Sequence, residues 1–167
     1  LYFPTPFNRV IALDPGTGKE RWTFDPGIDK SPGGDGFVCR GLAMWRDAST
    51  GERRLFLATL DARLIALDAK TGAKLFEVAL GQDVGQAYKG EYHVTSPPTV
   101  VGDRVVVGSA IDDNSRAKMS SGAVRAFDVR TGKLVWKWDP IPRDLDAGAA
   151  NAWSIFSADP ARDLVFI

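Results

Sequence analysis

The stretch RLIALDAKTGAKLFEVAL at residues 63–80 occurs in three variants along the chain. The other two copies are RVIALDPGTGKERWTFDP at residues 9–26 and AVRAFDVRTGKLVWKWDP at residues 123–140. The copies are spaced more widely than the blades of a WD40 propeller, which repeat every 40–45 residues or so. Each repeat therefore has room for four strands and long loops, and the pattern indicates a fold that is built by stacking one unit on the next.

Each copy reads as two strands joined by a tight turn. Alternating apolar residues lead to an aspartate, Thr-Gly follows within the turn, and a second alternating segment comes next. The turns begin at Asp14, Asp68 and Asp128 and contain Gly18, Gly72 and Gly132. The aspartate can accept hydrogen bonds from nearby backbone amides, and the glycine supplies a positive φ that other residues resist. The sequence therefore predicts three β-hairpins.

A large aromatic residue follows each turn glycine, and a small alanine precedes each turn aspartate. The aromatic residues are Trp22, Phe76 and Trp136, and the alanines are Ala12, Ala66 and Ala126. We expect each ring to be buried against the adjacent blade over the alanine, because a bulky ring needs a small neighbour. These rings would then belong to the core between blades and not to a binding site.

No segment has an apolar helical period of useful length, whereas FLATL, TVVGDRVVVGSA and LVFI are β-branched or aromatic runs. The predicted fold class is all-β, with about three blades of a β-propeller. A closed propeller has about 4–8 blades arranged around a central axis. We therefore expect residues 1–167 to be a partial propeller domain, incomplete at both ends, that needs further blades for closure.

The composition argues against several classes of partner and of site. The chain has 21 basic and 21 acidic residues, so its formal net charge is zero, and it lacks the basic surplus typical of proteins that bind nucleic acid or anionic lipid. Cys39 is the only cysteine, which excludes an internal disulfide framework and a cysteine-rich zinc site. The first residues already read as strand and turn, so an export signal or membrane anchor is expected upstream.

The repeat Ala-x-Asp-x-x-Thr-Gly-x-x-x-Trp resembles the tryptophan-docking motif of the eight-bladed quinoprotein dehydrogenases. The same repeat also occurs in non-enzymatic propellers, including a scaffold of outer-membrane protein assembly. A shared fold does not fix function, so the segments between the repeats must decide between an enzyme and a scaffold that binds protein partners.

Four of those segments resemble the cofactor-side loops of dehydrogenases that depend on pyrroloquinoline quinone (PQQ). They are VCRGLA at 38–43, VTSPP at 94–98, GSAIDDN at 108–114 and NAWS at 151–154. The run Asp112–Asn114, followed by SGAVRAFD at 121–128, is most similar to the membrane-bound glucose dehydrogenases. Alcohol-oxidising relatives carry adjacent cysteines near the cofactor, and the single Cys39 favours the glucose type.

The resemblance implies a cofactor role for four residues. Arg40 would lie beside the ortho-quinone oxygens, Trp153 would form a flat floor under PQQ, and Thr95 and Ser109 would bond to its carboxylates. Each has a structural alternative. Arg40 could form a salt bridge at a blade edge, Trp153 could pack in the core, and the two hydroxyls could satisfy local backbone groups.

The resemblance also implies a metal site for calcium or magnesium. Asp113 and Asn114 would supply hard oxygen ligands, with Asp112 beside them, although such a run is ordinarily a solvated turn. His93 is the only histidine, so a zinc site is excluded, and it has either a hydrogen-bonding, substrate-facing role or a structural one. Glu91 reads as part of a solvated loop.

The resemblance implies a PQQ-dependent enzyme that oxidises glucose or a related sugar or polyol by hydride transfer. Electrons would pass to ubiquinone at the periplasmic face of the bacterial inner membrane. Two departures from the family pattern bear on this expectation. Gly36 stands where glucose-type relatives often have a histidine, and the catalytic aspartate is expected beyond Ile167, so that this chain alone would be inactive.

Overall fold

The computed structural model describes residues 1–29, 36–112, 116–142 and 144–167, and these residues form antiparallel β-sheets. The first sheet contains β1 (Tyr2–Pro4), β2 (Val10–Leu13) and β3 (Glu20–Phe24). The second contains β4 (Ala43–Arg46), β5 (Arg53–Ala58), β6 (Arg63–Asp68) and β7 (Lys74–Ala79). Within the described ranges no helix is long and apolar enough to span a membrane.

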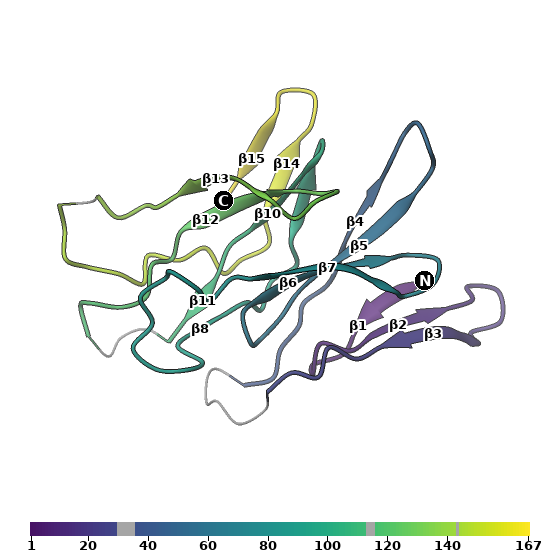
Figure 1. Cartoon of the computed structure of the whole chain (residues 1–167), viewed down its shortest axis with the longest axis horizontal. Helices are drawn as coiled ribbons and strands as arrows, with labels where there is room; N and C mark the ends of the chain where they lie inside the picture. The colour runs from purple at the N-terminus through teal and green to yellow at the C-terminus, as the bar shows by residue number, and fades with distance from the viewer. Residues whose placement is uncertain (30–35, 113–115, 143) are drawn as a thin grey trace.

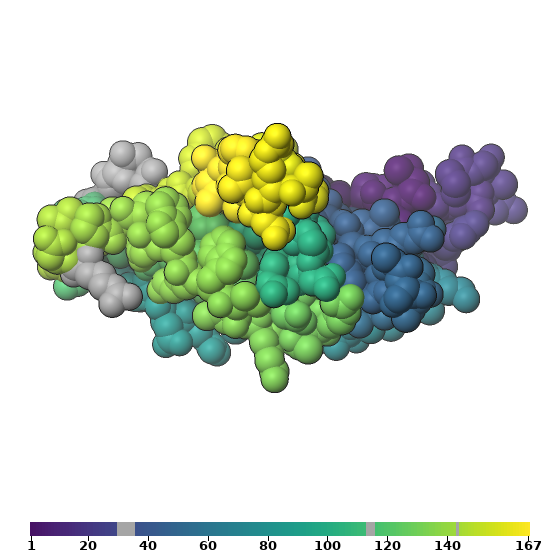
Figure 2. Space-filling model, turned by 90° about the horizontal axis from the view of Figure 1, so that it is seen from above, coloured from purple at the N-terminus to yellow at the C-terminus, as the bar shows by residue number. Residues whose placement is uncertain are grey.

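The third sheet contains β9 (Thr99–Val101), β10 (Arg104–Val107), β12 (Val124–Asp128) and β13 (Leu134–Trp138). β14 (Ser157–Asp159) and β15 (Leu164–Phe166) pair beside it, and a small ladder joins β8 (Tyr92–His93) to β11 (Ala110–Ile111). The chain thus forms two complete blades with a partial blade on each side (Figure 1). In the space-filling view the purple N-terminal blade lies at one end, and the yellow C-terminal hairpin lies against the third sheet (Figure 2).

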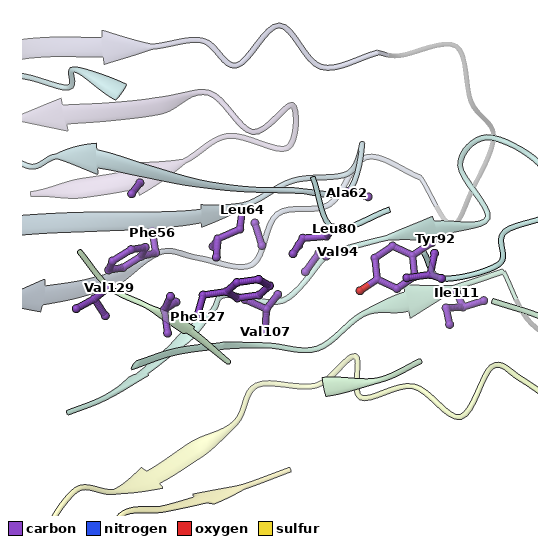
Figure 3. Packing of buried hydrophobic residues seen from close by; sticks show 14 of the residues in the cluster. Phe56, Ala62, Leu64, Leu80, Tyr92, Val94, Val107, Ile111, Phe127 and Val129 are labelled. Atoms are coloured by element: carbon purple, nitrogen blue, oxygen red, sulfur yellow. The ribbon is translucent and has the colours of Figure 1, made fainter. Parts of the chain in front are cut away.

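The central strands are apolar on both faces because each blade packs between two others. In β5, Leu55 and Leu57 pack toward the first blade, whereas Phe56 and Ala58 alternate with them and pack toward the third. Figure 3 shows Phe56 facing Val129 of the third blade within this second interface. This double burial explains why the strands read as continuous apolar runs instead of alternating apolar and polar residues.

The connections between strands alternate between the two ends of the blades, since strand order follows the sequence. The tight Asp-Thr-Gly turns lie at one end. The other connections lie at the opposite end, which we call the loop face. They comprise the described residues within 25–42, 59–62, 80–98, 108–123 and 139–156. The two sets occupy opposite sides of Figure 1. Every described residue that the sequence assigns to the cofactor falls on the loop face.

The structure confirms the chemistry of the predicted turns. Asp68 Oδ1 accepts hydrogen bonds from the backbone amides of Lys70 at 3.0 Å and Thr71 at 2.7 Å, and Gly72 has a φ of 75°. The sequence contains a further turn of this kind at residues 47–51, DASTG, which joins β4 to β5. Gly51 there also has a φ of 75°, but no aromatic residue follows it at the corresponding position.

The expectation that each ring lies over its alanine and docks against the adjacent blade is confirmed for Trp22 and Phe76. Ala12, Ala66 and Ala126 are the cross-strand neighbours of Trp22, Phe76 and Trp136 within the same blade. The small partner in the next blade is the turn glycine, because a Cβ placed on Gly72 would lie 2.6 Å from Trp22 Cε3, and one on Gly132 would lie 2.7 Å from Phe76 Cδ2.

The rings are less buried than predicted. Trp22 and Phe76 are half-buried, and Trp136 is 36% exposed. Residues 1–167 contain no fourth copy of the repeat, so none of them supplies a turn glycine for Trp136. Docking of a ring therefore requires both its own blade and the turn of the next one.

Substitution of Gly72 by alanine should reveal the strength of this docking. Gly51→Ala is the matched control, because Gly51 has the same φ and a Cβ added to it would meet no described atom within 4 Å. The control should lower the free energy of unfolding by about 1–2 kcal/mol through backbone strain. Gly72→Ala should cost about 1–3 kcal/mol more, since Trp22 must move. Equal losses in chemical denaturation of the two variants would contradict docking on Gly72.

Candidate cofactor site

A cavity of about 220 Å³ opens among four segments of the loop face. It is lined by Val38, Arg40, Thr95, Ala110, Ile111, Asn151 and Trp153. Three of the four residues predicted to contact PQQ therefore line one space, although they are far apart in the sequence. The antiparallel topology explains this convergence, because all the segments that carry them leave their blades at the same end.

Arg40 is held in the cavity wall by two contacts with Thr95. Its backbone amide donates to the Thr95 carbonyl at 3.0 Å, and its Nη1 donates to Thr95 Oγ1 at 2.5 Å. Among the described residues no carboxylate forms an ion pair with Arg40, so the salt bridge weighed as its alternative role is not found there. The guanidinium charge is fixed in position and remains available to a ligand.

Trp153 presents its ring to the cavity instead of packing in the core. The residue is 56% exposed, and the Arg40 guanidinium carbon lies 5.6 Å from the ring centroid. The backbone carbonyl of Trp153 accepts a hydrogen bond from the Ser96 hydroxyl, which ties the segment to the preceding blade. A flat ring and a cation thus lie side by side.

Ser109 lies behind the cavity wall and is 1% exposed. Its backbone amide donates to the Ala152 carbonyl at 3.1 Å, and its carbonyl accepts from Asn151 Nδ2 at 3.2 Å. The neighbouring Gly108 allows this approach, since a side chain there would collide with the Ala152 carbonyl. The Ser109 hydroxyl is buried without a hydrogen-bond partner among the described residues, so local backbone does not satisfy it.

These residues fit a planar, acidic cofactor such as PQQ. The Trp153 ring offers a stacking surface, Arg40 offers a cation, and the unpaired Ser109 hydroxyl offers a donor close to them. None of the described residues lining the cavity is acidic, so nothing in this wall repels a carboxylate.

The predicted metal ligands Asp113 and Asn114 lie outside the described residues. Asp112 is described, and its carboxylate accepts a hydrogen bond from the Tyr88 hydroxyl at 3.0 Å. Elsewhere in the described ranges no cluster of three or more His, Cys, Asp or Glu side chains could hold a metal ion. The assignment of calcium or magnesium to Asp113 and Asn114 therefore stays a prediction.

The interpretation of Glu91 as part of a solvated loop is wrong, because the residue is fully buried. Its carboxylate accepts hydrogen bonds from the backbone amides of Ala87 at 2.5 Å and Ser120 at 3.0 Å, and from Arg116 Nη2 at 2.6 Å. Its carbonyl accepts from the Asp112 amide at 3.0 Å. Glu91 thus joins the 80–98 segment to both flanks of residues 113–115. No sequence pattern links Glu91 to Arg116, which lies 25 residues later.

Burial raises the pKa of the Glu91 carboxyl, but three hydrogen bonds oppose this effect. The amides of Ala87 and Ser120 and the guanidinium of Arg116 favour the charged form and hold the pKa below its usual value. The buried side chain is therefore a carboxylate near neutral pH.

Comparison with known proteins assigns the chain to a family. The family model for the glucose/ethanol/alcohol dehydrogenase β-propeller domain, designated PQQ, matches residues 1–167. The chain is 31% identical to quinoprotein glucose dehydrogenase A of Acinetobacter calcoaceticus, and the match covers all of this chain and 25% of that protein. It is 33% identical to quinate/shikimate dehydrogenase (quinone) of Acinetobacter baylyi, with the same coverage of both proteins.

A solved structure agrees with this assignment. A quinohemoprotein alcohol dehydrogenase of Pseudomonas putida superimposes with a TM-score of 0.78 and 28% identity, over 98% of this chain and 26% of that one. The chain spans about a quarter of the length of the curated relatives that it matches. On the family match, the repeats and the all-β blades together, the chain belongs to the β-propeller family of PQQ-dependent quinoprotein dehydrogenases.

Proposed function

We propose that the complete protein is a PQQ-dependent dehydrogenase that oxidises glucose or a related sugar or polyol. The observation that carries this proposal is the convergence of Arg40, Thr95 and Trp153 on one cavity of the loop face. A propeller scaffold that binds protein partners needs the docking rings but not a fixed cation beside an exposed indole. The arrangement therefore favours an enzyme over a scaffold.

PQQ, when bound, supplies an ortho-quinone that accepts a hydride from the substrate. Arg40 would stabilise the negative charge that grows on the quinone oxygens, and Thr95 holds its guanidinium in place beforehand. Trp153 would stack against the flat face, while the Ser109 hydroxyl would donate to a carboxylate. Asp113 and Asn114 would hold calcium or magnesium through oxygen ligands. The aspartate that takes the substrate proton is assigned to a part of the protein outside residues 1–167.

The proposed substrate class rests on a few sequence features alone. The segments 112–114 and 121–128 and the single Cys39 support the glucose type, whereas Gly36 departs from it. Similar proteins are named for glucose, quinate or shikimate, and glycerol. In this proposal the electrons pass to ubiquinone, and the enzyme works at the periplasmic face of the inner membrane with its anchor upstream of Leu1.

Reconstitution of the complete apoprotein tests the proposal. We expect PQQ, added with calcium or magnesium, to quench tryptophan fluorescence in a saturable manner and to permit dye reduction. Glucose and polyols should support faster reduction than quinate or ethanol. Dye reduction that prefers ethanol or quinate would contradict the substrate class alone. A folded protein that does not bind PQQ would contradict the enzyme and favour the scaffold.

A further inference from the structure

His93 lies in the small ladder beneath the loop face, opposite Ala110 of the cavity wall. In this segment Tyr92 and Val94 belong to the hydrophobic core. Because side chains alternate along an extended chain, His93 and Thr95 point the other way. Thr95 lines the cavity, and so does Ala110, which is the cross-strand neighbour of His93. Residues directly opposite one another in an antiparallel pair share one face, so His93 shares the face of Ala110.

The imidazole of His93 is buried without a partner. The residue is 4% exposed, and neither ring nitrogen has a hydrogen-bond partner in the described part of the chain. A neutral imidazole carries one donor and one acceptor, and buried polar groups are nearly always paired. Ser109 immediately precedes Ala110, and its buried hydroxyl also has no hydrogen-bond partner among the described residues. Two unpaired polar groups thus lie next to residues of the cavity wall.

We infer that His93 is a further cofactor-binding residue, whose ring N–H donates a hydrogen bond to a carboxylate of PQQ. This inference rests on the proposed function. Arg40 lines the cavity, and His93 and Ser109 lie beside Ala110 of its wall with polar atoms that have no partner among the described residues. A planar ligand that carries both a quinone and carboxylates matches both, with the quinone oxygens at Arg40 and a carboxylate at His93 and Ser109. The unpaired nitrogens would then cost stability in the apoprotein and contribute affinity in the loaded protein.

The substitution His93→Leu tests this inference in the complete protein. A ligand-binding role predicts that the dissociation constant for PQQ, measured by fluorescence titration with excess calcium, rises about 10- to 100-fold, the usual effect of losing a hydrogen bond to a charged group. The melting temperature of the apoprotein should stay the same or increase, because an unpaired buried group has been removed. A purely structural histidine would lower the melting temperature instead.

Tyr92→Phe is the matched control from the neighbouring position. The Tyr92 hydroxyl accepts a hydrogen bond from Arg125 Nη2 at 2.5 Å inside the core. Its loss should lower the melting temperature and leave the affinity for PQQ unchanged. The two adjacent substitutions should therefore have opposite effects on stability and affinity.

Unchanged PQQ affinity in His93→Leu would overturn the inference, whatever happens to the melting temperature. If His93→Leu does not fold, His93→Gln replaces it, because glutamine keeps a donor. Its PQQ affinity should then stay within about threefold of wild type, and a larger loss would overturn the inference. Failure of the wild-type protein to bind PQQ would instead refute the proposed function, so the two failures are distinguishable.

Discussion

Replacement of Arg40 by alanine is expected to slow the reduction of PQQ by substrate about 10²–10³-fold in the complete enzyme, the usual cost of removing one preorganised charge stabiliser. Thr95 fixes the Arg40 guanidinium before the reaction starts, so no reorganisation is needed as charge develops. Folding and PQQ loading should remain nearly intact, because Arg40 is exposed and no described carboxylate pairs with it. Single-turnover absorbance measurements of the loaded enzyme would give the rate.

Two further variants sharpen this experiment. Arg40→Lys keeps the charge but loses the fixed, forked geometry, so its rate should lie between those of wild type and Arg40→Ala. Arg46→Ala removes an exposed arginine from β4 and should leave the rate unchanged. If Arg40→Ala merely lowered the melting temperature while the folded fraction reacted at the normal rate, Arg40 would be structural and its assignment to the cofactor site would be wrong.

Replacement of Glu91 by alanine is expected to lower the free energy of unfolding by about 3–5 kcal/mol, as is typical when one partner of a buried ion pair is removed. The substitution leaves the amides of Ala87 and Ser120 without an acceptor and Arg116 without its carboxylate. Denaturant unfolding of the complete protein would measure the loss.

A matched ion pair provides the control for Glu91. Glu52 contacts Arg54 at 2.6 Å, the same distance as between Glu91 and Arg116, but its side chain is 38% exposed. Glu52→Ala should therefore cost at most about 1 kcal/mol. Similar losses for the two substitutions would show that the burial of Glu91 does not determine its contribution.

The lowered pKa of Glu91 also predicts how stability depends on pH. A carboxyl whose pKa is lower in the folded state than its usual value of 4.5 stabilises the fold above that value. This contribution is lost as the pH falls below 4.5 toward the folded-state pKa. Glu91→Gln should therefore lose less stability than wild type over that interval in pH-dependent melting curves. Parallel curves for the two proteins would contradict this assignment.

The sequence predicted the blades well because their determinants are local. The turns at Asp14, Asp68 and Asp128 need only an aspartate, a glycine with positive φ and flanking strands. The glycine on which Trp22 docks could not be predicted, since Gly72 lies in the next blade and only the packing of two blades brings them together. The turn at residues 47–51 was missed because it lacks the aromatic residue.

The site was predicted in part. Resemblance selected Arg40, Thr95 and Trp153, and the structure brings them to one cavity. Glu91 could not be recognised, because its burial results from the packing of separate loop segments around it. The same holds for His93, whose missing hydrogen bonds depend on the surroundings of both nitrogens. The sequence of a loop does not show whether a polar residue in it is buried or exposed to water.

Each ring docks on a glycine of the blade that follows it in the sequence. A ring is therefore covered only after the next blade has been synthesised. During synthesis, Trp22 leaves the ribosome long before Gly72, and Phe76 long before Gly132. The newest blade therefore exposes an aromatic surface until the next turn has been made, and such transient exposure favours aggregation. Nascent chains from which Phe76 has emerged and Gly132 has not should bind chaperones more strongly than the same chains carrying Phe76→Ala, because the ring stays uncovered until the third turn docks on it.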